Sequence, residues 1–314
     1  MAYLRDIGER TLIRNMMNRI RPAGPYGPGD DAAVLTLRGD TVLSTDVVTF
    51  ARHMPPGMTF EEFGWMAAAV NFSDIAGMGA EPVGILVSFA MPDDLDETSL
   101  YAMMDGIDQC AEFCDTVIVG GDTKAGEGMI CCTAVGDTCG RPPLTRSGAR
   151  PGDIVAVTGT LGSAAAGFYA IRNGIREDEA VRSLKVPIPR IREGLILSKA
   201  CATSCMDISD GLSTTVSEVC ARSNVGMDIL WESLPVGAGV DDMSRVVPKE
   251  HMMLDFGGEY ELMFTFDRER IDVLYEKGLD FTVIGMVNDS GRANILKDGS
   301  IMEIQNGGYE HFKN

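Results

Sequence analysis

Long apolar segments and a secretion signal are both missing from this sequence. No run of about 18 apolar residues occurs, and Met1 to Asp6 has neither the basic start nor the apolar core of a signal peptide. These absences argue against a helical membrane span and against export. We therefore expect a soluble globular protein that contacts no membrane and works in the cytoplasm.

Metal-binding cysteine pairs are missing as well. The eight cysteines include no Cys-x-x-Cys pair. The four-residue spacings of Cys110 with Cys114 and of Cys201 with Cys205 would place neighbouring buried thiols on a helix. We interpret the cysteines as reduced core residues and not as zinc ligands.

Basic residues are scarce relative to acidic ones. There are 27 Lys and Arg against 46 Asp and Glu, which gives a formal charge of −19. Nucleic-acid binding needs basic surface to displace counterions, so this charge argues against it. A phosphorylated small molecule is still possible if divalent cations stand between carboxylates and phosphates. The charge therefore favours a complex of metal and nucleotide.

Glycine-rich phosphate-binding motifs are absent too. Neither a Gly-x-Gly-x-x-Gly nor a P-loop pattern occurs. Gly159 and Gly162 lie in the turn after a predicted strand, and they could face phosphates. The alternative is that they allow close packing of the next helix on that strand.

What the sequence does contain is aspartate beside glycine or at the ends of apolar runs. Runs such as 41–43 and 116–119 resemble strands, and the acidic segments follow them. Oxygen ligands that converge from several loops suit Mg2+ bound to phosphates. Each Asp alone could be a turn or cap residue. The segments are Gly29-Asp30-Asp31, Ser44-Thr45-Asp46, Asn71-Phe72-Ser73-Asp74, Gly120-Gly121-Asp122-Thr123 and Asp207-Ile208-Ser209-Asp210-Gly211.

The 314 residues, 45% of them hydrophobic, are enough for two domains of mixed α/β structure. Pro and Gly break the segment 141–152, so we predict a linker there between domains 1–140 and 150–314. A capping box at Thr59 predicts a helix that ends near 77–79 and places Asn71 and Asp74 on one face. Further helices are predicted over 97–114, from 164, over 212–222 and over 268–277, with strands over 82–89, 154–157, 262–266 and 281–284.

Seven motifs together resemble the thiamine-monophosphate kinase family, within the superfamily of aminoimidazole ribonucleotide synthetases. The similarity runs from about residue 5 to the closing segment 307–312. The motifs are Gly-Asp-Asp-Ala-Ala (29–33), Ser-Thr-Asp (44–46), Val-Asn-Phe-Ser-Asp-Ile-Ala-Gly-Met-Gly-Ala-Glu-Pro (70–82), Gly-Gly-Asp-Thr (120–123), Leu-Thr-Arg-Ser-Gly-Ala-Arg-Pro-Gly-Asp (144–153), Asp-Ile-Ser-Asp-Gly-Leu (207–212) and Gly-Gly-Glu-Tyr-Glu-Leu (257–262).

The resemblance implies a fold, a reaction and an assembly. The expected fold has an N-terminal α/β domain, which binds metal and ATP, and a C-terminal α/β domain. The N-terminal sheet is expected to form a barrel with its mate in a homodimer. The expected reaction transfers the γ-phosphoryl group of ATP, the co-substrate, to thiamine monophosphate with several Mg2+ ions, and it yields thiamine diphosphate and ADP.

The resemblance also implies roles for individual residues. The expected metal ligands are Asp31, Ser44, Thr45, Asp46, Asp74, Asp122, Asp207 and Asp210, of which Asp46, Asp122, Asp207 and Asp210 are the expected catalytic residues. The expected ATP contacts are Gly121, Asp122, Arg146 and Ser209, and the expected substrate contacts are His53, Glu259 and Tyr309.

The chemistry agrees with these roles. A phosphate monoester has its second pKa at about 6, so the acceptor needs no general base at neutral pH. The transfer needs charge neutralisation and in-line placement, which Mg2+ and an arginine supply. Taken alone, Arg146 could instead form a linker salt bridge, His53 could be structural, and Tyr309 could stack on the substrate or anchor the tail.

One departure from the family pattern concerns the acidic loop near the C-terminus. The family usually has Gly-Gly-Glu-Asp-Tyr-Glu-Leu, and here the Asp is missing, so either Glu259 or Glu261 could take the substrate position. Two other functions stay open. One is another ATP-dependent enzyme of the superfamily, such as aminoimidazole ribonucleotide synthetase, and the other is a regulator that binds nucleotide and Mg2+ without turnover.

Overall fold

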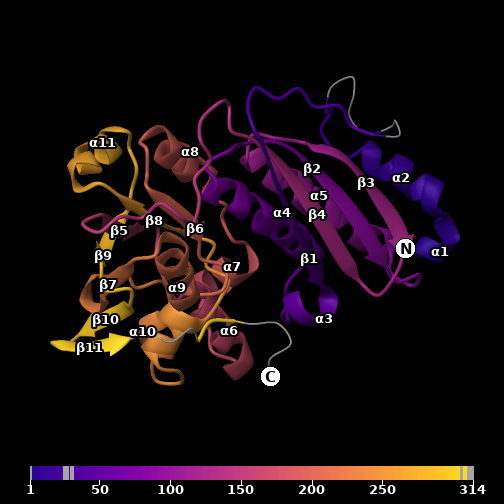
Figure 1. The fold of residues 1–314 in the computed structure, drawn as a ribbon. Helices are drawn as coiled ribbons and strands as arrows, with labels where there is room; N and C mark the ends of the chain where they lie inside the picture. The colour runs from indigo at the N-terminus through magenta and orange to yellow at the C-terminus, as the bar shows by residue number, and fades with distance from the viewer. Residues whose placement is uncertain (1, 24–27, 29–31, 305–306, 310–314) are drawn as a thin grey trace. The chain divides into compact units, whose positions relative to one another are not determined.

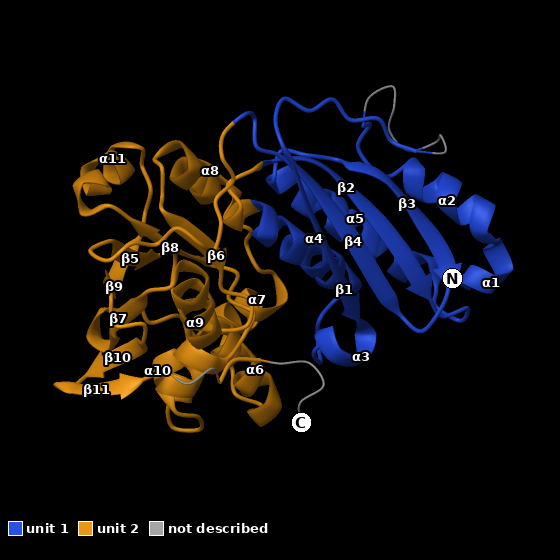
Figure 2. Ribbon diagram, in the orientation of Figure 1, with its two compact units in different colours: residues 1–75, 81–140 blue, residues 76–80, 141–314 orange. Residues whose placement is uncertain are grey.

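The computed structural model describes residues 2–23, 28, 32–304 and 307–309. It divides into two compact units, shown in Figure 2: Met1–Ile75 with Glu81–Gly140, and Ala76–Ala80 with Arg141–Asn314. The segment 141–152 belongs to the second unit, where Leu144 and Ala149 are buried. Asp31, predicted as a metal ligand, lies outside the described residues.

The first unit contains one four-stranded sheet in the order β1-β4-β2-β3 (Figure 1). β4 is antiparallel to both β1 and β2, and β3 runs parallel to β2. The elements are α1 Leu4–Ile7, α2 Glu9–Met17, β1 Thr41–Thr49, α3 Phe50–His53, α4 Phe60–Gly77, β2 Glu81–Met91, α5 Glu97–Phe113, β3 Ile118–Ala125 and β4 Met129–Asp137.

The long helices of this unit begin at side-chain caps. The backbone N–H of Glu62 donates to Thr59 Oγ1 at 3.1 Å and Glu62 Oε2 accepts from the Thr59 N–H at 2.7 Å, so the predicted capping box is confirmed. Asp96 caps α5, and hydrogen bonds from Thr98 and Ser99 lower its pKa to about 2. Capping fixes where each helix starts and therefore which residues face the sheet.

The second unit contains a seven-stranded sheet in the order β11-β10-β7-β9-β5-β8-β6. The elements are β5 Ile154–Val157, α6 Ser163–Asn173, α7 Asp178–Lys185, α8 Ile191–Lys199, β6 Ser204–Asp207, α9 Leu212–Ser223, β7 Gly226–Leu230, η1 Trp231–Ser233, α10 Val240–Met243, η2 His251–Asp255, β8 Leu262–Phe266, η3 Arg268–Arg270, α11 Ile271–Glu276, β9 Thr282–Asn288, β10 Ala293–Lys297 and β11 Ser300–Glu303. Of these, η2 is a single π-helical turn.

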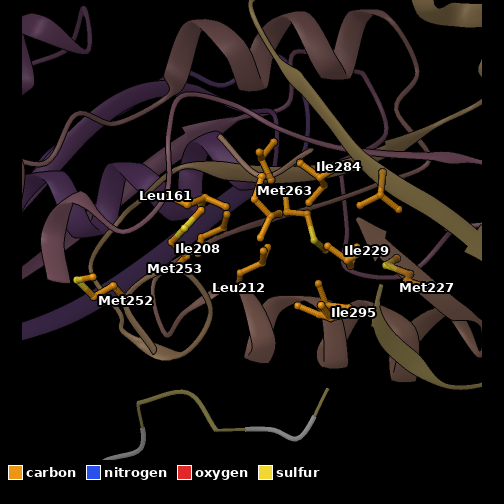
Figure 3. Packing of buried hydrophobic residues seen from close by; sticks show 14 of the residues in the cluster. Leu161, Ile208, Leu212, Met227, Ile229, Met252, Met253, Met263, Ile284 and Ile295 are labelled. Atoms are coloured by element: carbon orange, nitrogen blue, oxygen red, sulfur yellow. The ribbon is translucent and has the colours of Figure 1, made fainter. Parts of the chain in front are cut away.

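The core of the second unit lies between one face of this sheet and its helices. Figure 3 shows Met263, Ile229 and Ile295 from the strands gathered with Leu212 of α9, and all four are at most 3% exposed. Alternate residues of each strand face this core because side chains alternate between the two faces of a strand. The packing holds β6 and α9 in place, and the turn between them carries Asp207 and Asp210.

The predicted α/β class is confirmed, and so is the strand over 262–266. Two details of the prediction were wrong. Asp46 and Asp122 were expected to follow strands, but they lie inside β1 and β3, because pairing with β4 carries β1 on to Thr49 and pairing with β2 carries β3 on to Ala125. All eight cysteines are free thiols, but Cys131 and Cys139 are only partly buried and Cys201 is exposed, so these three are not core residues. None of the helices in the described ranges is both long and apolar enough to cross a membrane.

Candidate active site

In the first unit, the Ser44-Thr45-Asp46 motif of β1 lies beside the Asn71–Asp74 motif of α4. Ser44 Oγ donates a hydrogen bond to Asp74 Oδ2 at 2.5 Å, and the Asp46 N–H donates to Asn71 Oδ1 at 3.0 Å. Asn71 is fully buried and donates from its own amide to the Ala67 carbonyl at 3.0 Å, which fixes its orientation. Ser44 and Asp46 are two apart on a strand and therefore share the face toward α4.

Thr45 points to the other face of β1. Its hydroxyl donates to the Cys132 carbonyl at 3.0 Å and lies 2.9 Å from Thr133 Oγ1, both on β4. The alternation of side chains thus separates the Thr45 hydroxyl from the Ser44–Asp74 pair.

His53 ends the short helix α3, just after β1. Its Nδ1 accepts a hydrogen bond from the Thr49 N–H at 3.0 Å. The neutral ring therefore carries its proton on Nε2. This bond fixes the ring plane and makes Nε2 the donor that a substrate could use.

Gly121 and Asp122 of β3 line a cavity of about 740 Å³ within the first unit. The lining is mainly apolar and includes Ile13 and Met16 of α2 together with Ile118. A Cβ on Gly121 would lie 1.8 Å from the Val87 carbonyl oxygen, so only glycine fits there. The Asp122 side chain is 54% exposed and has Lys124 Nζ at 3.6 Å from Oδ1. A flat apolar ring and a phosphate chain could both be accommodated.

In the second unit, Asp207 ends β6 and is 4% exposed, whereas Ser209 and Asp210 in the following turn are partly exposed. Two neighbouring segments bracket the turn. The Gly258 N–H donates to the Ser209 carbonyl at 2.8 Å, and the Tyr309 N–H donates to the Asp210 carbonyl at 3.2 Å. The turn is therefore held by the 257–261 loop and by the C-terminal tail.

The side chain of Glu259, from the 257–261 loop, reaches the N-terminus of α6. Its Oε1 accepts from the N–H groups of Gly162 at 2.9 Å and Ala164 at 3.0 Å. Burial raises the pKa of Glu259 to about 8, the two N–H groups act in the opposite direction, and Glu261 adds to the rise. Both bonds use Oε1, so Oε2 is the oxygen on which a ligand contact could be built.

Glu261 is 6% exposed and forms an ion pair with Arg190. Arg190 Nε donates to Oε2 at 2.6 Å and its Nη2 donates to Oε1, while Thr158 Oγ1 donates to Oε2 at 2.7 Å. A Cβ on Gly159 would lie only 2.0 Å from Oε1. Both carboxylate oxygens are therefore engaged, and Glu261 has the surroundings of a structural group.

Arg146 is exposed, in a loop beside the edge strand of the second sheet. The Cys205 N–H of β6 donates to the Thr145 carbonyl at 2.9 Å, and Ser223 Oγ donates to the Arg146 carbonyl at 3.3 Å. Tyr309 is also exposed, at 48%. Both side chains are accessible to a ligand of the second unit.

Comparison with known proteins covers both units. Residues 29–138 match the AIR synthase related protein, N-terminal domain, and residues 150–298 match the AIR synthase related protein, C-terminal domain. Thiamine-monophosphate kinase of Methanospirillum hungatei is 36% identical over 301 residues, which span 95% of this chain and 98% of that protein. The chain belongs to the thiamine-monophosphate kinase family. The family's protein from Escherichia coli K12 is 33% identical over 97% of this chain and 98% of its own length.

Solved structures of the family show the same fold. Thiamine-monophosphate kinase from Stenotrophomonas maltophilia aligns with a TM-score of 0.80 at 30% identity, over 92% of this chain and 95% of that one. AaThiL complexed with AMPPCP and TMP aligns with a TM-score of 0.78 at 30% identity, over 99% of both chains. Hydrogenase maturation protein HypE of E. coli has a TM-score of 0.81 at 21% identity, over 96% and 98%, and shows the likeness of fold alone.

Within the first unit, the structure brings together some of the predicted site residues. Ser44 and Asp74 are in contact, and Gly121 and Asp122 line one cavity. Over the described part of the chain, no three or more His, Cys, Asp or Glu side chains stand close enough to hold a metal ion. The metal-ligand assignment therefore stays a prediction.

Sequence reasoning gave no role to two residues, Asn71 of the first unit and Arg190 of the second. Asn71 was placed on the face of Asp74, and that spacing was the signal for its bond to β1. Arg190 carried no signal, because it lies 71 positions before its partner Glu261 and outside every motif.

Proposed function

We propose that this protein transfers the γ-phosphoryl group of ATP to the phosphate of thiamine monophosphate and yields thiamine diphosphate and ADP. The observation that carries the proposal is the similarity to thiamine-monophosphate kinases over nearly the whole length of both chains. ATP as the donor fits a cytoplasmic reaction.

The donor atoms suit Mg2+. The side chains of Ser44, Asp46, Asp74, Asp122, Asp207 and Asp210 offer only hydroxyl and carboxylate oxygens, the hard ligands that Mg2+ takes. Held by these residues, Mg2+ would neutralise the negative charge of the phosphates during transfer. Within the described residues, Ser44 and Asp74 already touch, which supports a shared ligand at that point.

The chain's own groups supply the remaining requirements of the transfer. Gly121 lets β3 pack closely against Val87 of β2 and lines the cavity, and the apolar lining of that cavity suits an adenine ring. Arg146 is exposed and offers a planar fork to phosphate oxygens. Ser209 lies just before the N-terminus of α9, where backbone N–H groups favour an anion.

Three residues are proposed to contact the acceptor. His53 presents Nε2, and Tyr309 presents an exposed ring. We propose that the carboxyl group that contacts the substrate belongs to Glu259 and not to Glu261, because the ion pair with Arg190 occupies both oxygens of Glu261. No general base is assigned, since the acceptor phosphate is already ionised at neutral pH.

We also propose a homodimer built on the open face of the first sheet. Leu43, Val47 and Leu86 are 66%, 48% and 38% exposed on that face, which is more apolar surface than a sheet leaves to solvent without a use. A second copy would cover it and close the two sheets into a barrel. Leu43→Glu should shift the protein toward monomer in size-exclusion chromatography with light scattering, and an unchanged mass would contradict this arrangement.

A coupled assay of ADP release tests the kinase proposal. Wild-type protein should release ADP with thiamine monophosphate and Mg2+, and it should release almost none with thiamine, with aminoimidazole ribonucleotide precursors or in excess chelator. Turnover with a ribonucleotide precursor would favour the synthetase alternative. Nucleotide binding without turnover on any acceptor would favour the regulator.

A further inference from the structure

Four rings of the second unit form a partly exposed group that the assigned site residues do not include. Phe168 and Tyr169 of α6 pack with His251 and Phe256 at the two ends of η2, and we call these four the aromatic platform. The ring centroids of Phe168 and Phe256 are 5.3 Å apart, those of Phe168 and Tyr169 are 5.3 Å apart, and those of Tyr169 and His251 are 6.1 Å apart. All four residues are partly exposed.

The platform differs from the other aromatic cluster of the unit. Phe264 and Phe266 of β8 are at most 1% exposed, and their rings stack on each other in the interior. Tyr169 and Phe256 pack one side against the core, whereas Phe168 lies outside the core cluster. Its ring face carries the Arg172 guanidinium at 5.5 Å from the centroid. That face therefore already accepts a positive charge, as the electron-rich faces of aromatic rings do.

A hydrogen bond fixes the orientation of two of the rings. Tyr169 Oη and His251 Nε2 are 3.1 Å apart, and the Phe256 N–H donates to the His251 carbonyl at 3.0 Å. His251 Nδ1 lies 3.9 Å from Asp255 Oδ2. The platform is thus built from hydrogen-bonded, preorganised side chains and is not a loose surface patch.

The platform adjoins Glu259, the carboxylate assigned to the substrate. Glu259 accepts from the Ala164 N–H, and Phe168 stands one helical turn later on the same face of α6. A Cβ on Gly258 would lie 3.7 Å from Ala164 Cβ, so the loop from Phe256 to Glu259 runs along this face. The carboxyl group therefore lies at the N-terminus of α6, and the platform lies about one turn further along the helix.

We propose that the aromatic platform binds the ring system of thiamine monophosphate, an aromatic cation, beside Glu259. The inference rests on the proposed function. The thiazolium ring has a fixed positive charge and a flat π-face, so it gains from stacking and from cation–π attraction on the same rings. Asp255 supplies a carboxylate beside His251, and Arg172, which lies over the Phe168 ring, comes from an exposed position of α6.

Steady-state kinetics of matched variants test the platform. Phe168→Leu and Phe256→Leu should each raise KM for thiamine monophosphate by about tenfold and leave KM for ATP within about twofold of wild type. Phe168→Tyr, which keeps the ring, should restore the wild-type value. The control is Tyr275→Leu, because Tyr275 is a 55% exposed ring stacked on Phe281 of the same unit and away from Glu259.

Calorimetric binding of thiamine monophosphate without ATP separates this inference from the kinase proposal. If wild-type protein binds the compound but does not phosphorylate it, the kinase proposal fails and the affinities of the Phe168 variants still decide the platform. Wild-type binding with unchanged affinity in Phe168→Leu and Phe256→Leu would overturn the platform. Absence of binding by the wild type would overturn it as well.

Discussion

Glu261→Gln is expected to destabilise the second unit by about 3 kcal/mol. The substitution removes the charge that balances Arg190, while the guanidinium stays in place with both of its donors aimed at the former carboxylate. Loss of one partner of a buried pair costs about 3–5 kcal/mol. The Arg190 side chain is 27% exposed, so water relieves part of the penalty and the lower end applies. For a unit of this size the melting temperature should fall by about 6–12 °C.

Thermal and urea unfolding at pH 7 measure this cost. Glu259→Gln is the matched control, because the amide oxygen can still accept from Gly162 and Ala164, and it should not destabilise the unit at pH 7, where the raised pKa of Glu259 already disfavours the folded state. The double variant with Arg190→Gln should be less destabilised than the sum of its single variants, since it leaves no unbalanced charge. A loss below about 0.5 kcal/mol in Glu261→Gln would show that this carboxylate is solvated, and the assignment of Glu259 over Glu261 would lose its basis.

Three further predictions follow from individual contacts. Gly159→Ala should lower the free energy of unfolding by more than about 2 kcal/mol, because its Cβ would meet Glu261 Oε1 at 2.0 Å. Gly152→Ala is the control in the same unfolding assay: its φ is positive but nothing lies within 4 Å of the added Cβ, so it should show the backbone strain alone. The pKa of Glu259 is raised from 4.5 to about 8, so its contribution to stability is complete below pH 4.5 and is lost as the pH rises through 8; the slope of unfolding free energy against pH over that window should flatten in Glu259→Gln, and an unchanged slope would refute the assignment. Asp207→Asn should abolish transfer and blunt the rise in melting temperature caused by Mg2+ with nucleotide, yet leave the unliganded protein at least as stable; a large loss of that stability with the rise intact would identify Asp207 as a structural cap.

Local signals in the sequence predicted the elements with clear ends. The capping box at Thr59 located the start of α4, and the apolar run 262–266 coincides with β8. These signals are short-range, because a cap or an alternating run is complete within a few residues. The same reasoning placed Asn71 and Asp74 on one helix face, which is the face that meets β1.

Contacts between distant segments could not be predicted in this way. Arg190, the partner of Glu261, lies 71 residues earlier in the sequence. The Tyr309 N–H of the C-terminal tail likewise bonds to the carbonyl of the distant Asp210. The length of β1 was also underestimated, because Asp46 interrupts its apolar pattern and only pairing with β4 carries the strand through to Thr49. Tertiary pairing overrode the local pattern at this position.

Partners, and not residue type, separate structural from functional carboxylates in this chain. Asp137 is 1% exposed and accepts from the N–H groups of Arg38 and Cys139, which hold its pKa below the usual range, and Glu261 is held by Arg190. Such groups are saturated by the protein itself and stabilise a loop or a strand end. Asp122 is 54% exposed beside a 65% exposed Lys124, an ion pair that water and salt weaken. A carboxylate of this second kind keeps oxygen lone pairs for an incoming cation, so the structure favours Asp122 over Asp137 as a ligand although both stand in strands of the same sheet.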